Sequence, residues 1–231
     1  VGPYWPKVPA KLQLRERLRE WWEPGTSYLV DASNRHAISH RIKRRARQWG
    51  GVMQLSQEHA AARVIESGRD PLGLGRWVCT LYRGKDNRQL RVITAYRPCY
   101  KATKGLENVH AQHSNYYNTH FPQKNKMPRE EILLDLTKEL HTWIQAGEHV
   151  ILMMDCNEDV RSSRIQQFLH DSDLRDVIHE RHGTDAPPTY KGGKVPIDGI
   201  FASRLVNCTL GGYTSFDKGV QGKRADHQCL W

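Results

Sequence analysis

The sequence predicts an α+β fold in which mainly antiparallel β-sheets carry helices on their outer faces. The first observation is a hairpin over residues 76–96, where the pattern changes to period two on either side of a turn at 84–87. The second is a strong amphipathic helix that begins at Pro128. The third is that no glycine-rich phosphate loop follows a strand, so a parallel Rossmann-like sheet ranks second.

The N-terminal half predicts one helix and several short strands. Residues 9–22 have apolar side chains at i, i+4, i+7 and i+8 counted from Leu14, which indicates an amphipathic helix. Short strands follow at 52–55 and 61–66, and the hairpin supplies two more. Residues 101–127 are polar and predict a long surface loop.

The C-terminal half alternates helices and strands. The helix from Pro128 has Glu130 and Glu131 in its first turn, where carboxylates suit the positive end of the helix dipole, and Gly147 is a plausible stop. The later elements, in chain order, are a buried strand at 149–154, a short helix at 164–170, and strands within 195–203 and 205–216.

Composition predicts a single globular domain over residues 1–231 and excludes a disordered chain. No apolar run approaches the roughly 18 residues that a membrane span needs, so no membrane partner is expected. The polar, proline-rich start predicts no signal peptide. Five cysteines without a CxxC pair predict reduced, mostly buried thiols and an intracellular compartment. We expect His110, His113 and His120 at the surface, since no cysteine or carboxylate cluster completes a zinc set.

The net charge of +10 favours a polyanionic partner, most commonly nucleic acid. Residues 1–50 contain eleven Lys/Arg against four Asp/Glu, which is +7 of the total. This basic run could be a solvated loop or localisation-type patch, or it could contact phosphates, and the residues leave both open. Its members are Arg41, Lys43, Arg44, Arg45 and Arg47.

Three polar segments lie at or near predicted strands. Asp155 and Asn157 follow the strand at 149–154, and a spacing of two points both to the same side of an extended chain. Asp198 interrupts an apolar strand, where a carboxylate needs a partner, and a histidine is a candidate. Asp226 and His227 are adjacent and therefore face opposite ways. Each segment alone is also typical of ordinary turns or structural aspartates.

In this order the three segments resemble the motifs of the endonuclease/exonuclease/phosphatase (DNase I-like) superfamily, usually written GDFN, RIDYI and SDH. Residues 95–98 are similar to a strand-ending motif of that family, with Tyr96 at its active-site tyrosine or histidine position. Residues 188–190 resemble its threonine-plus-aromatic segment. The resemblance covers 50–231 well and the first fifty residues loosely. The stretches that look most like retroelement-type endonuclease domains are 63–68, 73–77 and 196–201.

The resemblance implies a four-layered α/β-sandwich of two mainly antiparallel sheets, and phosphodiester hydrolysis with Mg²⁺ or Mn²⁺. Oxygen ligands suit such hard cations, which keep several waters and need few protein ligands. The implied catalytic residues are Asp155, Asn157, His227, Asp198 and Tyr96; the implied metal ligands are Asp226 and Asp155; Arg97 is implied as a phosphate contact.

The roles implied by the resemblance divide the chemistry among these side chains. Asp155 orients or deprotonates the attacking water, and Asn157 positions it. His227 donates a hydrogen bond to the phosphoryl oxygen, and Asp198 holds the His227 imidazole in one tautomer and favours its charged form. Tyr96 donates a hydrogen bond to the phosphate.

The chain departs from the family pattern at its N-terminus. The family begins with a strand ending in Asn and a second strand ending in Glu, the principal metal ligand, and neither is visible before Tyr4. The sequence also stops at Trp231, inside an expected closing strand. We therefore expect a domain truncated at both ends and lacking its first strands. An upstream segment or another chain would then complete the sheet.

Three functions follow from these observations. The first is a metal-dependent endonuclease, acting on DNA rather than RNA. The second is a catalytically inactive relative that binds nucleic acid or serves as a structural subunit of a larger ribonucleoprotein or protein complex, which the missing Glu favours. The third is a small-phosphoester phosphatase, and the charge of +10 favours a polymeric substrate over it.

Overall fold

The structure is a computed structural model that describes residues 27–32, 49–100, 106–209, 211–216 and 226–231. The helix expected at 9–22 and the basic run at 41–47 lie outside these residues. No helix among the described residues is long and apolar enough to cross a membrane.

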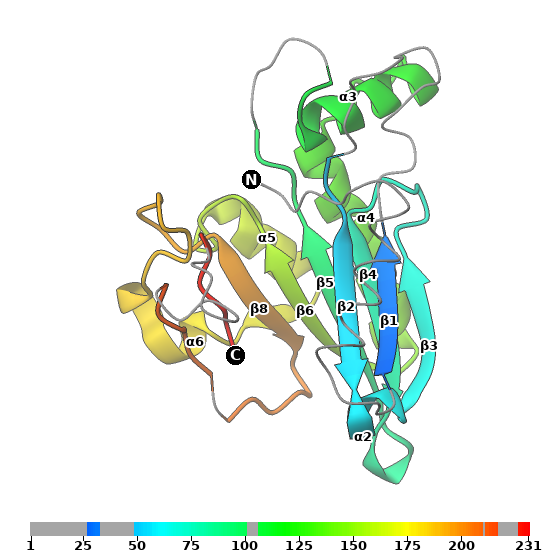
Figure 1. The fold of residues 1–231 in the computed structure, drawn as a ribbon, viewed down its shortest axis with the longest axis vertical. Helices are drawn as coiled ribbons and strands as arrows, with labels where there is room; N and C mark the ends of the chain where they lie inside the picture. Colours follow the sequence, from blue (N-terminus) through cyan, green and yellow to red (C-terminus); the bar gives the residue numbers. More distant parts are fainter. Residues whose placement is uncertain (1–26, 33–48, 101–105, 210, 217–225) are drawn as a thin grey trace.

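The secondary structure alternates strands with helical segments along the chain (Figure 1). The strands are β1 (Ser27–Ala32), β2 (Val52–Gln57), β3 (Val64–Arg69), β4 (Trp77–Arg83), β5 (Gln89–Tyr96), β6 (His149–Asp155), β7 (Leu174–Asp176) and β8 (Asp198–Ser203). The helical segments are α2 (Glu58–Ala61), η1 (Lys85–Asn87), α3 (Val109–His120), α4 (Pro128–Gln145), α5 (Ser163–Asp171), α6 (His179–His182) and η2 (Gly183–Asp185).

Six of the strands form one sheet with the order β3-β4-β5-β6-β8-β7. Among the described strands only β5 and β6 pair in parallel, and α3 and α4 lie in the connection between them, as a parallel crossover requires. The other pairs are antiparallel, including the predicted hairpin of β4 and β5. A parallel Rossmann-like sheet is therefore wrong for this chain.

One face of this sheet is covered by α4 and α5. The core between them contains Trp77 of β4, Ile93 of β5 and Leu152 of β6, together with Leu136 of α4 and Phe168 of α5. Each fully buried side chain of this size contributes about 1.5–3 kcal/mol through the hydrophobic effect. The prediction of the α4 helix is confirmed: it starts with a proline and ends before Gly147, whose φ of +84° suits glycine.

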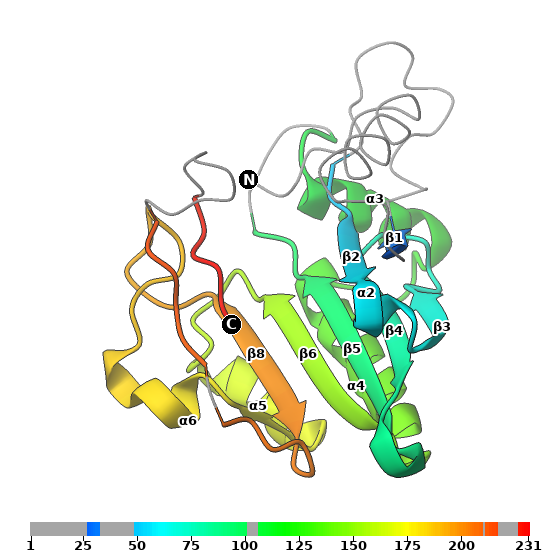
Figure 2. The ribbon, with the colours of Figure 1, turned by 60° about the horizontal axis from the view of Figure 1, so that its bottom comes forward.

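The opposite face carries a second sheet, which in the described residues consists of β1 and β2 paired antiparallel. This pair packs over β4 and β5, with Val30 and Val52 against Val78 and Tyr96. In Figure 2, β1 and β2 lie on one side of β4 and β5, and α4 lies on the other. The two sheets with helices outside confirm the predicted fold class.

The prediction of a surface loop over 101–127 is wrong, because α3 occupies residues 109–120. Asn108 caps this helix by accepting a hydrogen bond from the Ala111 N–H at 2.8 Å. His113, expected at the surface, is buried, and its Nε2 lies 3.0 Å from the Leu74 carbonyl oxygen. Burial lowers the pKa of His113 to about 3, so its ring is neutral.

Several element boundaries also differ from the prediction. The strand expected at 61–66 is β3 at 64–69, because α2 takes up residues 58–61. The described residues of 205–216 form no strand, and contribute only an isolated bridge from Tyr213 to Leu230. All five cysteines are free, and only Cys79 and Cys156 are buried. The expectation that most of the thiols are buried is therefore wrong.

Candidate active site

Three side chains predicted from separate motifs form a row across the middle of the large sheet. Tyr96 at the end of β5 pairs in register with Asp155 at the end of β6, and Asp155 pairs with Asp198 at the start of β8. Alternation along each strand places all three on the face opposite α4, since Ala95 and Met154, next to Tyr96 and Asp155, belong to the α4 core. Phe201, an odd number of positions from Asp198 along β8, belongs to the same core. The row is thus fixed by strand register alone.

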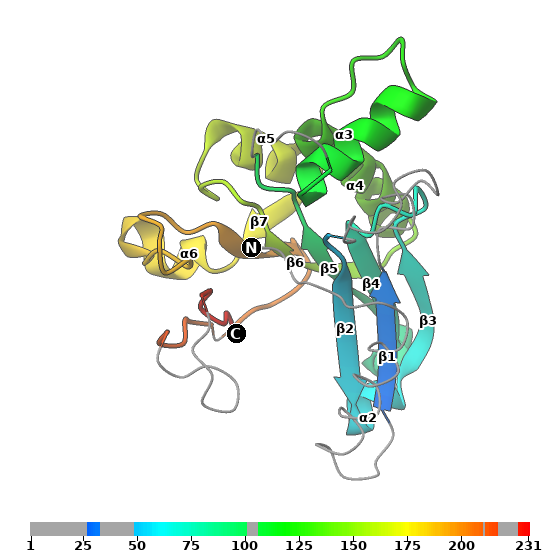
Figure 3. The ribbon, with the colours of Figure 1, turned by 45° about the horizontal axis from the view of Figure 1, so that its top comes forward.

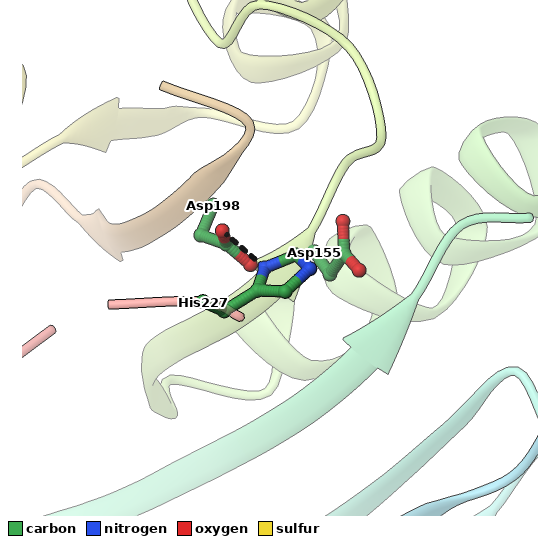
Figure 4. A group of neighbouring side chains, drawn as sticks. All are labelled: Asp155, Asp198 and His227. Atoms are coloured by element: carbon green, nitrogen blue, oxygen red, sulfur yellow. Dashed lines mark hydrogen bonds and ion pairs between the residues drawn. The ribbon is translucent and has the colours of Figure 1, made fainter. Parts of the chain in front are cut away.

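His227 completes the group from the C-terminal segment. Its Nδ1 lies 2.8 Å from Oδ2 of Asp198, which is the pairing expected from the sequence (Figure 4). The hydrogen bond to Asp198 is the main reason that the pKa of His227 is raised. With Nδ1 held by Asp198, Nε2 is the nitrogen left for another partner, and in Figure 4 the ring lies between the Asp198 and Asp155 carboxylates.

Thr189 fixes the position of Asp198. Its buried hydroxyl oxygen accepts hydrogen bonds from the backbone N–H groups of Ile197 and Asp198 at 2.9 and 3.0 Å. The Thr189 carbonyl oxygen accepts from the Gln228 N–H at 2.7 Å. One threonine therefore holds both partners of the His227–Asp198 pair, which gives a structural role to the threonine-plus-aromatic segment noted in the sequence.

Tyr190 supports the histidine from the same segment. It forms an isolated antiparallel bridge with His227, and the two rings lie 5.2 Å apart between centroids. The Lys191 N–H donates to the Asp226 carbonyl oxygen at 2.8 Å. Residues 189–191 thus form a short ladder with 226–228, and this ladder brings the distant histidine to the strand ends.

Asp155 is the most perturbed acid in the row. Burial, followed by repulsion from the Asp198 carboxylate, raises its pKa from 3.8 to about 7, although His227 and the Asn157 N–H act in the opposite direction. The Asn157 N–H donates to Asp155 Oδ1 at 2.9 Å. A carboxylate whose pKa lies near neutrality is suited to exchange a proton with water at physiological pH.

Tyr96 and Asn157 lie beside Asp155. Burial, followed by the charge of Asp155, raises the pKa of Tyr96 to about 12, while the Cys99 backbone and the Asn157 side chain act in the opposite direction. Asn157 Nδ2 donates to the Arg97 carbonyl oxygen at 2.8 Å. The Asn157 backbone has a φ of +47°, a conformation that asparagine tolerates better than most residues. The protonated Tyr96 hydroxyl is therefore a hydrogen-bond donor beside Asp155.

Arg97 does not contact solvent, which corrects its expected role as a phosphate contact. The side chain is fully buried, and it donates to the carbonyl oxygens of Arg129 and Cys156 at 2.9 and 3.1 Å and to Glu158 at 2.7 Å. A guanidinium enclosed by carbonyl and carboxylate oxygens in the interior cannot reach a nucleic-acid backbone. Arg97 instead ties the end of β5 to the segment after β6.

Arg129 and Glu158 join Arg97 in tying the end of β5 to the segment after β6, and neither residue was predicted from the sequence. Arg129 donates to the carbonyl oxygens of Pro98 and Asn157 at 2.6 and 3.2 Å and to Glu158 at 3.0 Å. Burial acts to raise the pKa of Glu158, but the hydrogen bond from Arg97 opposes it most strongly, and the pKa is lowered to about 2. In the sequence, the only sign of these contacts is the acidic residue directly after Asn157. The two arginines that pair with it are brought close only by the fold.

The oxygen donors at this site fit a divalent cation. Ligand atoms of Asp155, Asp198 and His227 lie within 4.8 Å of one another, the one such group found among the described residues. Two carboxylates at this spacing suit Mg²⁺ or Mn²⁺, which prefer oxygen. A cation would also offset the repulsion that raises the pKa of Asp155. Asp226 is exposed and lines the same pocket without joining this group.

The row lies at one side of a pocket of about 570 Å³ between β2, the strands β5, β6 and β8, and the C-terminal segment. Figure 3 shows the C-terminal segment on the side of β8 away from α5. The lining combines the polar group with apolar side chains that include Met53, Met153 and Ile200. The site is therefore open to a ligand larger than a water molecule, with its polar groups gathered at one place.

Comparison with known proteins relates the chain to a set of solved structures. No protein-family model and no curated protein sequence matches it. The human Nocturnin catalytic domain with bound sulfate anion is 14% identical, with a TM-score of 0.55 over 96% of this chain and 76% of that chain. An endonuclease/exonuclease/phosphatase family protein from Leptotrichia buccalis is 14% identical, with a TM-score of 0.55 over 100% of this chain and 79% of that one.

A third similar structure is D. rerio TDP2 complexed with single strand DNA product. It is 13% identical, with a TM-score of 0.51 over 96% of this chain and 80% of that chain. Identities this low relate the folds and leave the chemistry to be argued from the side chains themselves.

Proposed function

We propose, on the premise that this chain has the endonuclease/exonuclease/phosphatase fold, that it is a metal-dependent hydrolase of phosphodiester bonds in nucleic acid. The observation that carries the proposal is the row of Tyr96, Asp155 and Asp198 in strand register, with His227 hydrogen-bonded to Asp198 at 2.8 Å. The single strand DNA in the TDP2 structure and the net charge of +10 both support a nucleic-acid substrate.

In this proposal Asp155 orients the attacking water and accepts its proton. His227 donates its Nε2–H to a phosphoryl oxygen, while Asp198 keeps Nδ1 protonated. The Tyr96 hydroxyl donates to a second phosphate oxygen. Asn157 keeps Asp155 in place through the hydrogen bond from its backbone N–H, while its side chain donates to the Arg97 carbonyl oxygen.

Asp155 and Asp226 would hold the metal, Mg²⁺ or Mn²⁺, with Asp198 close by. Bound there, the cation would offset the negative charge that develops on the phosphate and the leaving oxygen. The finer proposal is an endonuclease of retroelement type that prefers DNA to RNA, and it rests on the stretches at 63–68, 73–77 and 196–201.

The test is nicking of supercoiled plasmid with Mg²⁺, with EDTA as a control and with Asp155→Asn and His227→Ala as variants. Loss of a proton-transfer group lowers the rate by about 100- to 10,000-fold, so each variant should lose nearly all activity. The matched control is His170→Ala, because the His170 side chain is 81% exposed and lies outside the site. Full activity in both site variants would refute the proposal. The same assay on single-stranded RNA tests the preference for DNA.

A second candidate is a non-catalytic relative that binds nucleic acid. The observation that favours it is that, among the described residues, only Asp155 and Asp198 bring carboxylates together with His227, and Asp226 stays outside the group. This candidate predicts salt-sensitive binding of oligonucleotides in EDTA with no turnover when Mg²⁺ or Mn²⁺ is added. Metal-dependent cleavage that His227→Ala abolishes would exclude it.

A further inference from the structure

An exposed aromatic side chain stands just beyond the catalytic end of β5. Tyr100 is 65% exposed. Its ring meets the ring of His110 in α3, with centroids 5.2 Å apart and planes at 79°. This T-shaped contact restrains the Tyr100 ring, and no ring of the described part of the chain stacks parallel to it.

Two hydrogen bonds hold the segment before Tyr100 against the site. Arg129 donates to the Pro98 carbonyl oxygen at 2.6 Å. Arg97 N–H donates to the Asp155 carbonyl oxygen at 2.9 Å. Tyr100 therefore directly follows a segment that is tied to the site and that begins at Tyr96, the residue with the proposed phosphate-binding hydroxyl.

The surroundings of the ring pair suit an aromatic, electron-rich ligand. His110 is half-buried, and burial, followed by the positive charge of Arg129, lowers its pKa, which leaves the ring neutral at physiological pH. Aromatic rings near a cationic side chain are the usual elements of a base-stacking surface.

We propose that Tyr100 and His110 form a stacking site for an unpaired nucleobase next to the scissile phosphate. A base in a duplex is already stacked on both sides, so the site selects a single-stranded or flipped-out nucleotide. This inference rests on the proposed function, which supplies the nucleic-acid substrate. It adds that the substrate is a strand with at least one unstacked base at the site.

The experiment measures binding of the full chain to fluorescein-labelled oligodeoxynucleotides by fluorescence anisotropy in EDTA, so that no cleavage occurs. The probes are a single strand, the same strand in a duplex, and a strand of equal length made of abasic sugar-phosphate units. The variants are Tyr100→Ala and Tyr100→Phe, with Leu205→Ala as the matched control. Leu205 is 79% exposed and lies beyond the end of β8 opposite Asp198.

Stacking is worth about 1–3 kcal/mol per base, and 1.4 kcal/mol is tenfold, so Tyr100→Ala should weaken single-strand binding about 5- to 150-fold. Tyr100→Phe and Leu205→Ala should stay within about twofold of the unchanged chain, as surface substitutions usually do. The Tyr100→Ala loss should vanish on the abasic strand, which has no base to stack, and be small on the duplex. A structural role for Tyr100 would instead weaken all three probes equally.

Equal affinity of Tyr100→Ala and the unchanged chain for the single strand would overturn the inference, as would an equal loss on the abasic strand. Because these measurements contain no metal, they are independent of turnover. Plasmid nicking that is absent in the unchanged chain would refute the hydrolase proposal, while a base-dependent loss in the same protein would still support the stacking site.

Discussion

Replacing Asp155 by asparagine should stabilise the metal-free protein at neutral pH while it abolishes cleavage. Burial and the neighbouring Asp198 carboxylate raise the pKa of Asp155 from 3.8 to about 7. One pKa unit corresponds to about 1.36 kcal/mol, so the charged form costs the folded protein up to about 4 kcal/mol above pH 7. The asparagine side chain removes the charge and can still accept the hydrogen bond from the Asn157 N–H.

The sign of this pH dependence follows from proton binding. Between pH 3.8 and about 7 the folded protein holds a proton on Asp155 that the unfolded chain has released. The free energy of unfolding therefore falls as pH rises through this window. Above the window, the stabilisation that results from the proton on Asp155 is fully lost. Asp155→Asn lacks this slope, so the stability difference between the variant and the unchanged chain should grow from pH 4 to 7 and then level off.

The assay is urea denaturation in EDTA at pH 4, 5, 6, 7 and 8, followed by tryptophan fluorescence, for which the buried Trp77 is a probe. A variant that is less stable than the unchanged chain at pH 8, or a difference that does not change with pH, would refute the reasoning. A parallel series with Mn²⁺ at about 100 times its Kd should stabilise the unchanged chain by about 2.7 kcal/mol and the variant by much less.

Three further substitutions test the supports of the site and the core. Arg97→Met should lower the free energy of unfolding by about 1–3 kcal/mol, because the Arg129 and Cys156 carbonyl oxygens lose their donor while Glu158 keeps Arg129 as a partner; the affinity of the folded protein for DNA should not change, and weaker DNA binding with unchanged stability would instead support the phosphate contact. Thr189→Val should lower the free energy of unfolding, measured by thermal denaturation, by about 1–3 kcal/mol, since two backbone N–H groups lose their acceptor, and it should also slow nicking. Leu136→Ala should cost about 2–5 kcal/mol in urea denaturation, whereas Leu134→Ala, at a position 55% exposed, should change stability by about 0.5 kcal/mol or less; similar costs would contradict the placement of α4.

The local pattern of the sequence determined the elements whose periodicity is strong. The hairpin of β4 and β5, the helix α4 and the strand β6 all lie where the spacing of apolar residues predicted them. Each of these elements buries a regular face, so the pattern that folds it can be read from a short window. A carboxylate inside an apolar strand needs a hydrogen-bonding partner, so the sequence predicted a partner for Asp198, and the family resemblance implied that this partner is His227.

Helix α3 shows where that local reading fails. Its buried residues fall at helical spacing after the capping Asn108, but they include Gln112 and His113, which read as surface residues in a polar segment. Both are buried because of distant partners: the Leu74 carbonyl lies near His113, and Gln112 Oε1 accepts from the Trp49 N–H at 3.2 Å. These partners are 39 and 63 residues away along the chain, so no local pattern contains them.

Arg97 illustrates the same limit at the site. Its residue type and its place after Tyr96 predicted a phosphate contact, yet the tertiary structure buries it against Glu158, 61 residues further on. The sequence by itself indicated the candidate site residues Asp155, Asp198 and His227 and the order in which their segments follow one another along the chain. Only the tertiary structure decided which side chains face the pocket and which support it, because burial and charge pairing depend on residues that are brought together by strand register and helix packing.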